Sequence, residues 1–104
     1  MRAAVLSRGK GWAFGPWNSA LSVAVGFSDH GLDEPHAHDE MFEVYLVARG
    51  SATIEVAGTA TSLRAGSVVV VEPGEPHTFH DASADYLHFV VQTPFVEGDK
   101  RLVN

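Results

Sequence analysis

Hydrophobic and polar residues alternate along this chain in short stretches that are separated by glycine and proline, a pattern that predicts β-strands joined by turns. The clearest case is Ala52, Ile54 and Val56, which alternate with Thr53 and Glu55 in the period of two of a half-buried strand. No segment longer than two turns shows a helical period. The pattern therefore favours an all-β fold.

The same pattern predicts further strands at residues 19–27, 43–49, 68–71, 77–80 and 86–92. The valine run at 68–71 suits a strand that is buried on both faces. Turns are expected at Gly50, at Gly58 and in the sequence EPGEP at 72–76, and a loop is expected at 29–35. Many short strands with regular turn signals favour a sandwich or a barrel.

With 104 residues the chain is long enough for a single domain, which we expect at residues 19–96. Residues 1–18 contain Trp12, Phe14 and Trp17 and are too apolar for a free tail, so we expect them to pack on the barrel or on a partner. The two tryptophans could form a lid, but packing in a homodimer is favoured because exposed tryptophan is costly. Residues 97–104 are expected to form a loose C-terminal tail.

Composition narrows the classes of partner and of chemistry. The chain has no cysteine, which excludes disulfides and thiolate ligands, so any metal ion must be held by nitrogen and oxygen. A formal net charge of −6 with only seven Lys and Arg argues against a nucleic-acid partner. No apolar run approaches the roughly 20 residues of a membrane span, and the apolar stretch at residues 3–6 is too short for a secretory signal. We therefore expect a cytoplasmic protein.

His36 and His38 lie two residues apart, so a strand would place both imidazoles on one face, close enough to share an ion. The pair alone is a weak signal, because six histidines in 104 residues bring such a spacing by chance. Glu43 lies an odd number of residues from both histidines, so on one unbroken strand its side chain would point to the opposite face. It can join them only if it begins the next strand and faces the same interior. In that strand Glu43, Tyr45 and Val47 would point one way.

His77 follows the EPGEP turn, and we expect it to share an inward face with Phe79. Two longer motifs then include these residues. The first contains Gly31, His36, His38, Glu43 and Gly50; the second contains Gly66, Pro73, Gly74, His77 and Asp81. In this order and spacing the two motifs resemble those of the cupins, in particular the small single-domain cupins. The departures are a gap before His36 that is one residue short, Glu72 for a proline and Asp81 for an asparagine, and none falls on a ligand position.

This resemblance implies a cupin jelly-roll β-barrel with a metal ion inside its mouth. Carried over residue by residue, it gives the ligands His36, His38, Glu43 and His77. Three imidazoles and one carboxylate suit one divalent transition metal such as Mn, Fe, Co, Ni or Zn, and leave two open positions on an octahedral ion. The ion and Glu43 together carry +1, which should attract a small bidentate anion.

The residues that would line the pocket are less constrained. Tyr45 and Phe79 are candidates, although both could equally be plain core aromatics. On the strand at 86–92 two alternatives stay open: either the face of His88 lines the pocket, or the apolar face of Phe89 does. His80 and Asp81 could support a ligand but are favoured as surface polar groups.

The expected function is that of a metal-dependent enzyme, an oxygenase, decarboxylase or isomerase, acting on a small oxygen-rich acid or phenol. The sequence assigns no catalytic acid or base. The alternative is a barrel that binds or senses a small molecule without turnover. In either case we expect a small-molecule ligand, a homodimer, and neither nucleic acid nor membrane as partner.

Overall fold

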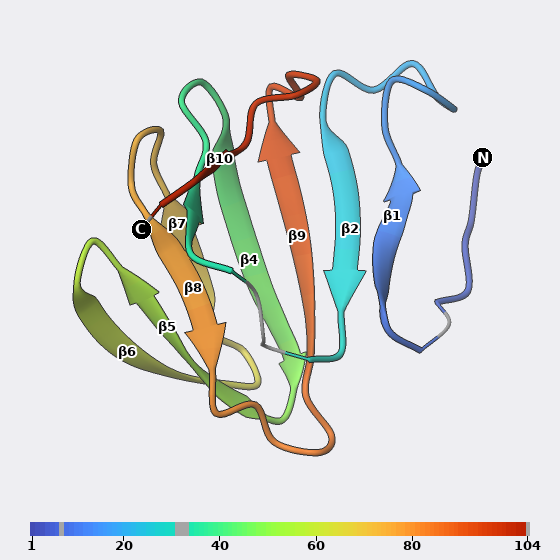
Figure 1. Ribbon diagram of the computed structural model, residues 1–104. Helices are drawn as coiled ribbons and strands as arrows, with labels where there is room; N and C mark the ends of the chain where they lie inside the picture. Colours follow the sequence, from blue (N-terminus) through green and yellow to red (C-terminus); the bar gives the residue numbers. More distant parts are fainter. Residues whose placement is uncertain (7, 31–33, 104) are drawn as a thin grey trace.

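The computed structural model describes residues 1–6, 8–30 and 34–103, which form ten strands in two antiparallel sheets (Figure 1). The first sheet has the order β1 (Lys10–Phe14), β2 (Ala24–Ser28), β9 (Leu87–Thr93), β4 (Phe42–Arg49) and β7 (Val68–Val71). The second has the order β10 (Arg101–Leu102), β3 (His36–Ala37), β8 (His77–His80), β5 (Ser51–Val56) and β6 (Thr59–Arg64). This confirms the predicted all-β jelly roll. The described residues contain no helix long and apolar enough to cross a membrane.

Most predicted strands are present within a residue of their expected bounds, but the first is much shorter. It begins only at Ala24, because side-chain hydrogen bonds hold the preceding residues in a turn: Ser19 Oγ donates to the Gly15 carbonyl (2.7 Å) and accepts from the Leu21 amide (3.2 Å). Strand β6 was not predicted, since its residues are mostly small and exposed. It pairs with β5 across a two-residue turn, Ala57–Gly58, in which both residues have positive φ.

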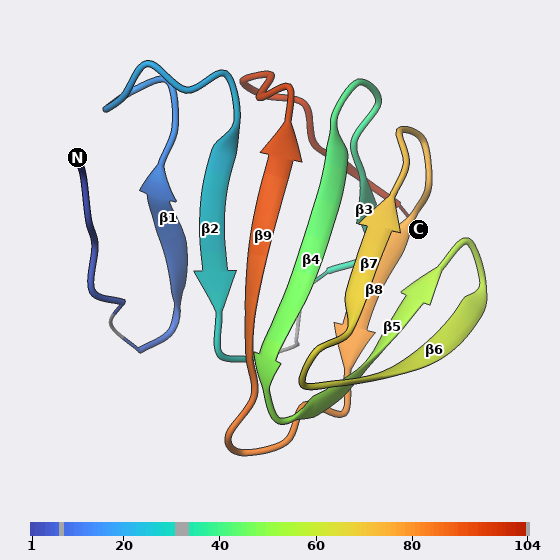
Figure 2. The same cartoon turned by 180° about the vertical axis from the view of Figure 1, so that it is seen from behind.

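The expectation that the valine run is buried on both faces is wrong. Val68 and Val70 are 62% and 54% exposed, whereas Val71 is buried in the core. The reason is topological: β7 lies at the edge of its sheet, beyond β4 (Figure 2). Its inward residues Val69 and Val71 pack in or against the core, and Val68 and Val70 face solvent. Four identical residues hide the alternation that a strand with one solvent face normally shows.

The expectation of a loose C-terminal end is also wrong. Strand β10 pairs with β3, with Leu102 opposite His36, and the Val103 amide donates to the Pro35 carbonyl (3.0 Å). Backbone pairing of this kind needs no apolar pattern, so the sequence carries little sign of it. At the other end of the chain β1 pairs with β2 and extends the first sheet. Gly31, the first residue of the first motif, lies outside the described residues.

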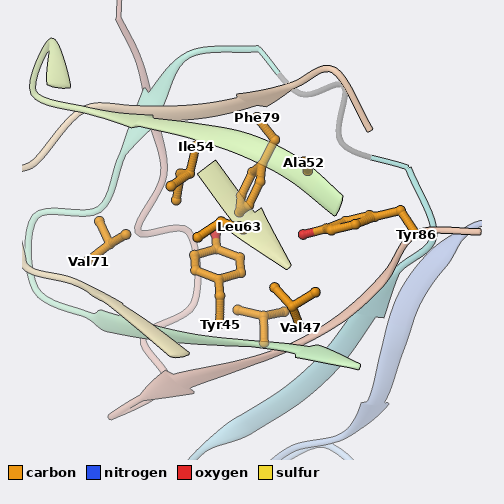
Figure 3. Packing of buried hydrophobic residues seen from close by; sticks show 9 residues of the cluster. Tyr45, Val47, Ala52, Ile54, Leu63, Val71, Phe79 and Tyr86 are labelled. Atoms are coloured by element: carbon orange, nitrogen blue, oxygen red, sulfur yellow. The ribbon is translucent and has the colours of Figure 1, made fainter. Parts of the chain in front are cut away.

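The apolar core fills the space between the two sheets (Figure 3). It comprises Tyr45, Val47, Ala52, Ile54, Leu63, Val71, Phe79, Tyr86 and Val90. The buried polar residues include His36 opposite His77 in one sheet and Glu43 opposite Gln92 in the other. The register of the strands thus places a polar group of side chains on facing sheets beside the core.

Gly50 carries the chain from β4 in the first sheet to β5 in the second, and this crossing explains the glycine at the end of the first motif. Its φ is +74°, and a Cβ atom there would lie 2.6 Å from Tyr86 Cα. We expect Gly50→Ala to lower the free energy of unfolding by roughly 3 kcal/mol, from left-handed strain plus the clash. Gly58→Ala is the matched control, because Gly58 has φ +85° but no atom within 4 Å of the added Cβ. The control should cost about 1 kcal/mol in urea unfolding; equal losses in both variants would contradict this account of Gly50.

Candidate metal centre

Four buried side chains converge between the two sheets, and they are the four that the motifs indicate. His36, His38, Glu43 and His77 each offer one ligand atom, and these atoms all lie within 4.8 Å of one another. His36 lies on β3 and His77 on the neighbouring β8, with ring centroids 4.3 Å apart. His38 follows the end of β3, and Glu43 reaches in from β4 of the opposite sheet. The cluster therefore joins the two sheets.

Each histidine is oriented by a backbone carbonyl. His36 Nδ1 donates to the Glu34 carbonyl (2.8 Å), His77 Nδ1 donates to the Glu75 carbonyl (3.0 Å), and His38 Nδ1 donates to the Asp99 carbonyl. A carbonyl oxygen only accepts, so the proton of each neutral ring is on Nδ1. The Nε2 lone pairs of all three rings are then available for a metal ion, an arrangement typical of histidine ligands.

The contacts inside the cluster fit a bound cation. His77 Nε2 lies 2.9 Å and His38 Nε2 lies 3.2 Å from the same oxygen, Glu43 Oε1. Lone pairs this close to a carboxylate oxygen repel it unless a proton or a metal ion supplies positive charge. His38 Nε2 is in addition buried without a hydrogen bond of good geometry, an uncommon state for a polar atom. This donor set of three nitrogens and one oxygen fits one divalent transition-metal ion.

Glu43 is held in its ionised form. Burial by itself would raise its pKa, but hydrogen bonds from His38 and His77 in their protonated form, and from Tyr45 and Gln92, lower the pKa far below its ordinary value of 4.5. The Tyr45 hydroxyl donates to Oε1 (2.5 Å), and Gln92 Nε2 donates to Oε2 (2.9 Å). Tyr45 thus contacts the cluster directly. The sequence did not single out Gln92 as a partner of Glu43.

Asp99 is a residue beside the cluster that sequence reasoning missed. Its carbonyl orients His38, and its carboxylate accepts from the backbone amides of Asp39 (2.8 Å), Glu40 (2.9 Å) and Met41 (2.9 Å). Burial tends to raise the Asp99 pKa, but these three hydrogen bonds lower it below its ordinary value. One C-terminal residue therefore holds the whole loop between β3 and β4. No motif includes Asp99, which follows His38 by 61 residues.

A cavity of about 410 Å³ opens beside the cluster, and the other predicted pocket residues, Tyr45, Phe79 and His88, all line it. His88, Val90 and Gln92 point inward from β9, whereas Leu87, Phe89 and Val91 face outward, which decides between the two alternatives left open above. His80 lies outside this cavity, in a partly exposed network with Asp81 (2.7 Å) and Glu55 (3.1 Å).

His88 is itself oriented by a buried hydroxyl. The Tyr86 hydroxyl and His88 Nδ1 share a hydrogen bond of 2.6 Å, and burial raises the pKa of Tyr86, which keeps that hydroxyl protonated. Because a phenol hydroxyl can both donate and accept, this bond fixes the orientation of the His88 ring and is compatible with a proton on either ring nitrogen. The ring packs beside Tyr45 and Phe79, with centroids 5.1 and 4.9 Å away. This places a proton-bearing imidazole in the wall of the cavity.

The chain belongs to the cupin family: the model of the Cupin domain matches residues 25–92. A comparison with curated protein sequences finds no match.

Solved structures of cupins superpose over most of the chain. A cupin-like protein from Thermotoga maritima matches with a TM-score of 0.78 and 19% identity, over 98% of this chain and 90% of that one. Streptomyces Pac13, a nucleoside dehydratase solved with uridine, matches with a TM-score of 0.73 and 20% identity, over 84% and 72%. The DMSP lyase DddQ from Ruegeria pomeroyi matches with a TM-score of 0.75 and 21% identity, over 91% of this chain but 51% of that one. At these identities the likeness shows the fold.

The role of Asp99 can be tested by removing its carboxylate. We expect Asp99→Ala to weaken zinc binding about tenfold, because the loop that carries His38 loses three hydrogen bonds and the ligand is less well oriented. Competition with a chromophoric chelator measures the affinity. Asp85→Ala removes a carboxylate that accepts a hydrogen bond from Ser83 (2.7 Å) in the loop after β8, away from the cluster, and should leave the affinity unchanged. Equal zinc affinity in Asp99→Ala and the unmodified protein would refute the role.

Metal affinity should depend on pH through the imidazoles. Burial lowers the pKa of His38, but the contacts with Glu43 and Asp99 outweigh it, and the net pKa is raised above the ordinary 6.5. A raised pKa favours the protonated ring, which cannot ligate, so protons displace the metal as pH falls through a value above 6.5. Cobalt(II) titrations from about pH 8 to about pH 5 should show a steep loss of affinity. A flat profile would exclude three histidine ligands.

Proposed function

We propose that this chain holds one divalent transition-metal ion with His36, His38, Glu43 and His77, and that it is a metal-dependent enzyme acting on a small oxygen-rich acid or phenol. The observation that carries the proposal is that the buried cluster borders a cavity of about 410 Å³, so that a small molecule could reach the ion. A purely structural metal site would be closed by its own ligands.

A divalent ion at this site supplies Lewis acidity toward the oxygen atoms of a bound acid or phenol. The chain's own residues do the remaining work. Tyr45 and Gln92 fix the Glu43 carboxylate, and the apolar side chains of Phe79 and Val90 limit the water in the cavity. His88, held in orientation by its hydrogen bond with Tyr86, is the proton donor of this proposal. A proton donor beside the cluster suits decarboxylation or isomerisation, because in both the substrate takes up a proton. Oxygenation is the third reaction in the proposed set.

The relatives support an enzymatic role, since the similar structures include a nucleoside dehydratase and a lyase. Their own substrates differ from each other, so the shared fold does not choose a reaction for this chain. The homodimer and the cytoplasmic location stay predictions of the sequence.

Elemental analysis of the purified protein is the direct test of the metal. We expect about one ion per chain, and a loss of most of it in His77→Ala, because three ligands hold a divalent ion much less firmly than four. His80→Ala is the matched control, since His80 lies three residues further on β8 but outside the cluster. Metal retained in His77→Ala, or absent from the unmodified protein after reconstitution with several ions, would refute the site.

Turnover separates the two candidate functions. The metal-loaded protein should convert small hydroxy acids or phenols at a rate that disappears with chelation and falls strongly in His88→Gln, which removes the proton donor while the metal stays. Saturable binding without product would favour the non-catalytic binding barrel instead.

A further inference from the structure

The cavity beside the cluster is positively charged in a chain that is acidic overall. Both lysines of the sequence, Lys10 on β1 and Lys100 before β10, line this cavity. Among the described residues neither lysine forms an ion pair, and the one carboxylate that lines the cavity is Glu43. With a divalent ion in place the cavity carries net positive charge, although the chain has a formal net charge of −6. Such a local field selects an anion.

Two tryptophans near this cavity each pack directly against a glycine. A Cβ atom at Gly26 would lie 2.6 Å from Trp12 Cε3, and one at Gly15 would lie 2.1 Å from Trp17 Cζ3, so each indole lies directly on a glycine backbone. Even so, Trp12 and Trp17 remain 48% and 52% exposed. The rings are thus fixed in position with much of their surface open, which is how aromatic side chains are presented to a ligand.

The open surfaces of the two tryptophans face a second hollow, a groove of about 460 Å³. Met41, Phe95 and Val96 make up much of the rest of its lining, and Trp17 meets Phe95 edge to face at 5.4 Å. The groove and the metal cavity share four lining residues, namely Trp12, His38, Gln92 and Lys100. A basic, metal-binding compartment and an aromatic compartment therefore meet at the cluster.

Resting on the proposed function, we infer that the ligand is a small aromatic acid. Its acidic oxygens occupy the cavity between the cluster and the two lysines, and its ring lies in the groove against Trp12 and Trp17. An aliphatic acid would leave the fixed indoles exposed, and a neutral aromatic would leave the lysines without a counter-charge. Among oxygen-rich acids and phenols, the ligand is therefore one that carries both an acidic group and an aromatic ring.

A matched pair of ligands tests whether the aromatic ring of the ligand contributes to binding. Zinc-loaded protein is titrated calorimetrically with salicylate and with its ring-hydrogenated analogue, cis-2-hydroxycyclohexanecarboxylate, which keeps a carboxylate and an adjacent hydroxyl but has no aromatic ring. The Trp17→Leu variant separates ring contacts from the greater acidity of the phenol. We expect salicylate to bind about fivefold tighter. Trp17→Leu should reduce this preference to less than about twofold. Phe42→Leu, which removes an exposed aromatic ring from β4 outside both hollows, should preserve it.

Substitution of a lysine tests independently whether the negative charge of the ligand contributes to binding. Lys100→Gln should weaken both acids about fivefold, since it removes a charge that both ligands use. Arg64→Gln removes the same charge from exposed β6 and should change neither. Equal affinity of the unmodified protein for the two acids, or a preference that survives Trp17→Leu, would overturn the inference. The metal content of each sample is measured in parallel: absence of zinc contradicts the proposed function alone, and the affinity ratio in the metal-free protein then still tests the groove.

Discussion

Three imidazole nitrogens and a carboxylate oxygen are held together in a buried place, and much of the structure serves to maintain that arrangement. Backbone carbonyls of Glu34, Glu75 and Asp99 orient the three rings, so that their lone pairs converge on Glu43. The lone pair of His77 Nε2 and the carboxylate oxygen Glu43 Oε1 lie 2.9 Å apart and repel each other unless a cation lies between them. Hydrogen bonds from Tyr45 and Gln92 offset part of the negative charge of the carboxylate, and a bound metal ion would offset the rest.

The interior is divided between packing and chemistry, and single residues serve both. The Tyr45 ring meets Phe79 edge to face at 4.8 Å inside the core, while its hydroxyl holds Glu43. On β9 the inward residues run from a core valine to the polar His88 and Gln92 of the cavity wall. This sharing means that the geometry of the cluster depends on the packing of the two sheets, and that changes in the core would also disturb the ligands.

The comparison of expectation with structure shows which signals were strong. Strands β4, β5 and β8 were predicted because a turn residue precedes or follows each and their alternation is clear. The burial of β7 was misjudged because four valines carry no alternation, and the solvent face of an edge strand follows from its place in the sheet. The C-terminal segment was misjudged because its contacts are backbone pairs with β3 and the bonds of one carboxylate. Backbone contacts of this kind leave almost no trace in a single sequence.

By itself the sequence determined the all-β class and most of the strands, because local periodicity records what each residue does within its own strand or turn. The four residues of the cluster came from the resemblance of two motifs to those of the cupins. Only the tertiary structure decided that Asp99 supports His38, that His88 rather than Phe89 faces the cavity, and that Lys10, Lys100 and Trp12 line that same cavity. Those contacts join residues from opposite ends of the chain. The order of strands in the sheets brings them together, and that order depends on the packing of the whole domain and not on any local pattern.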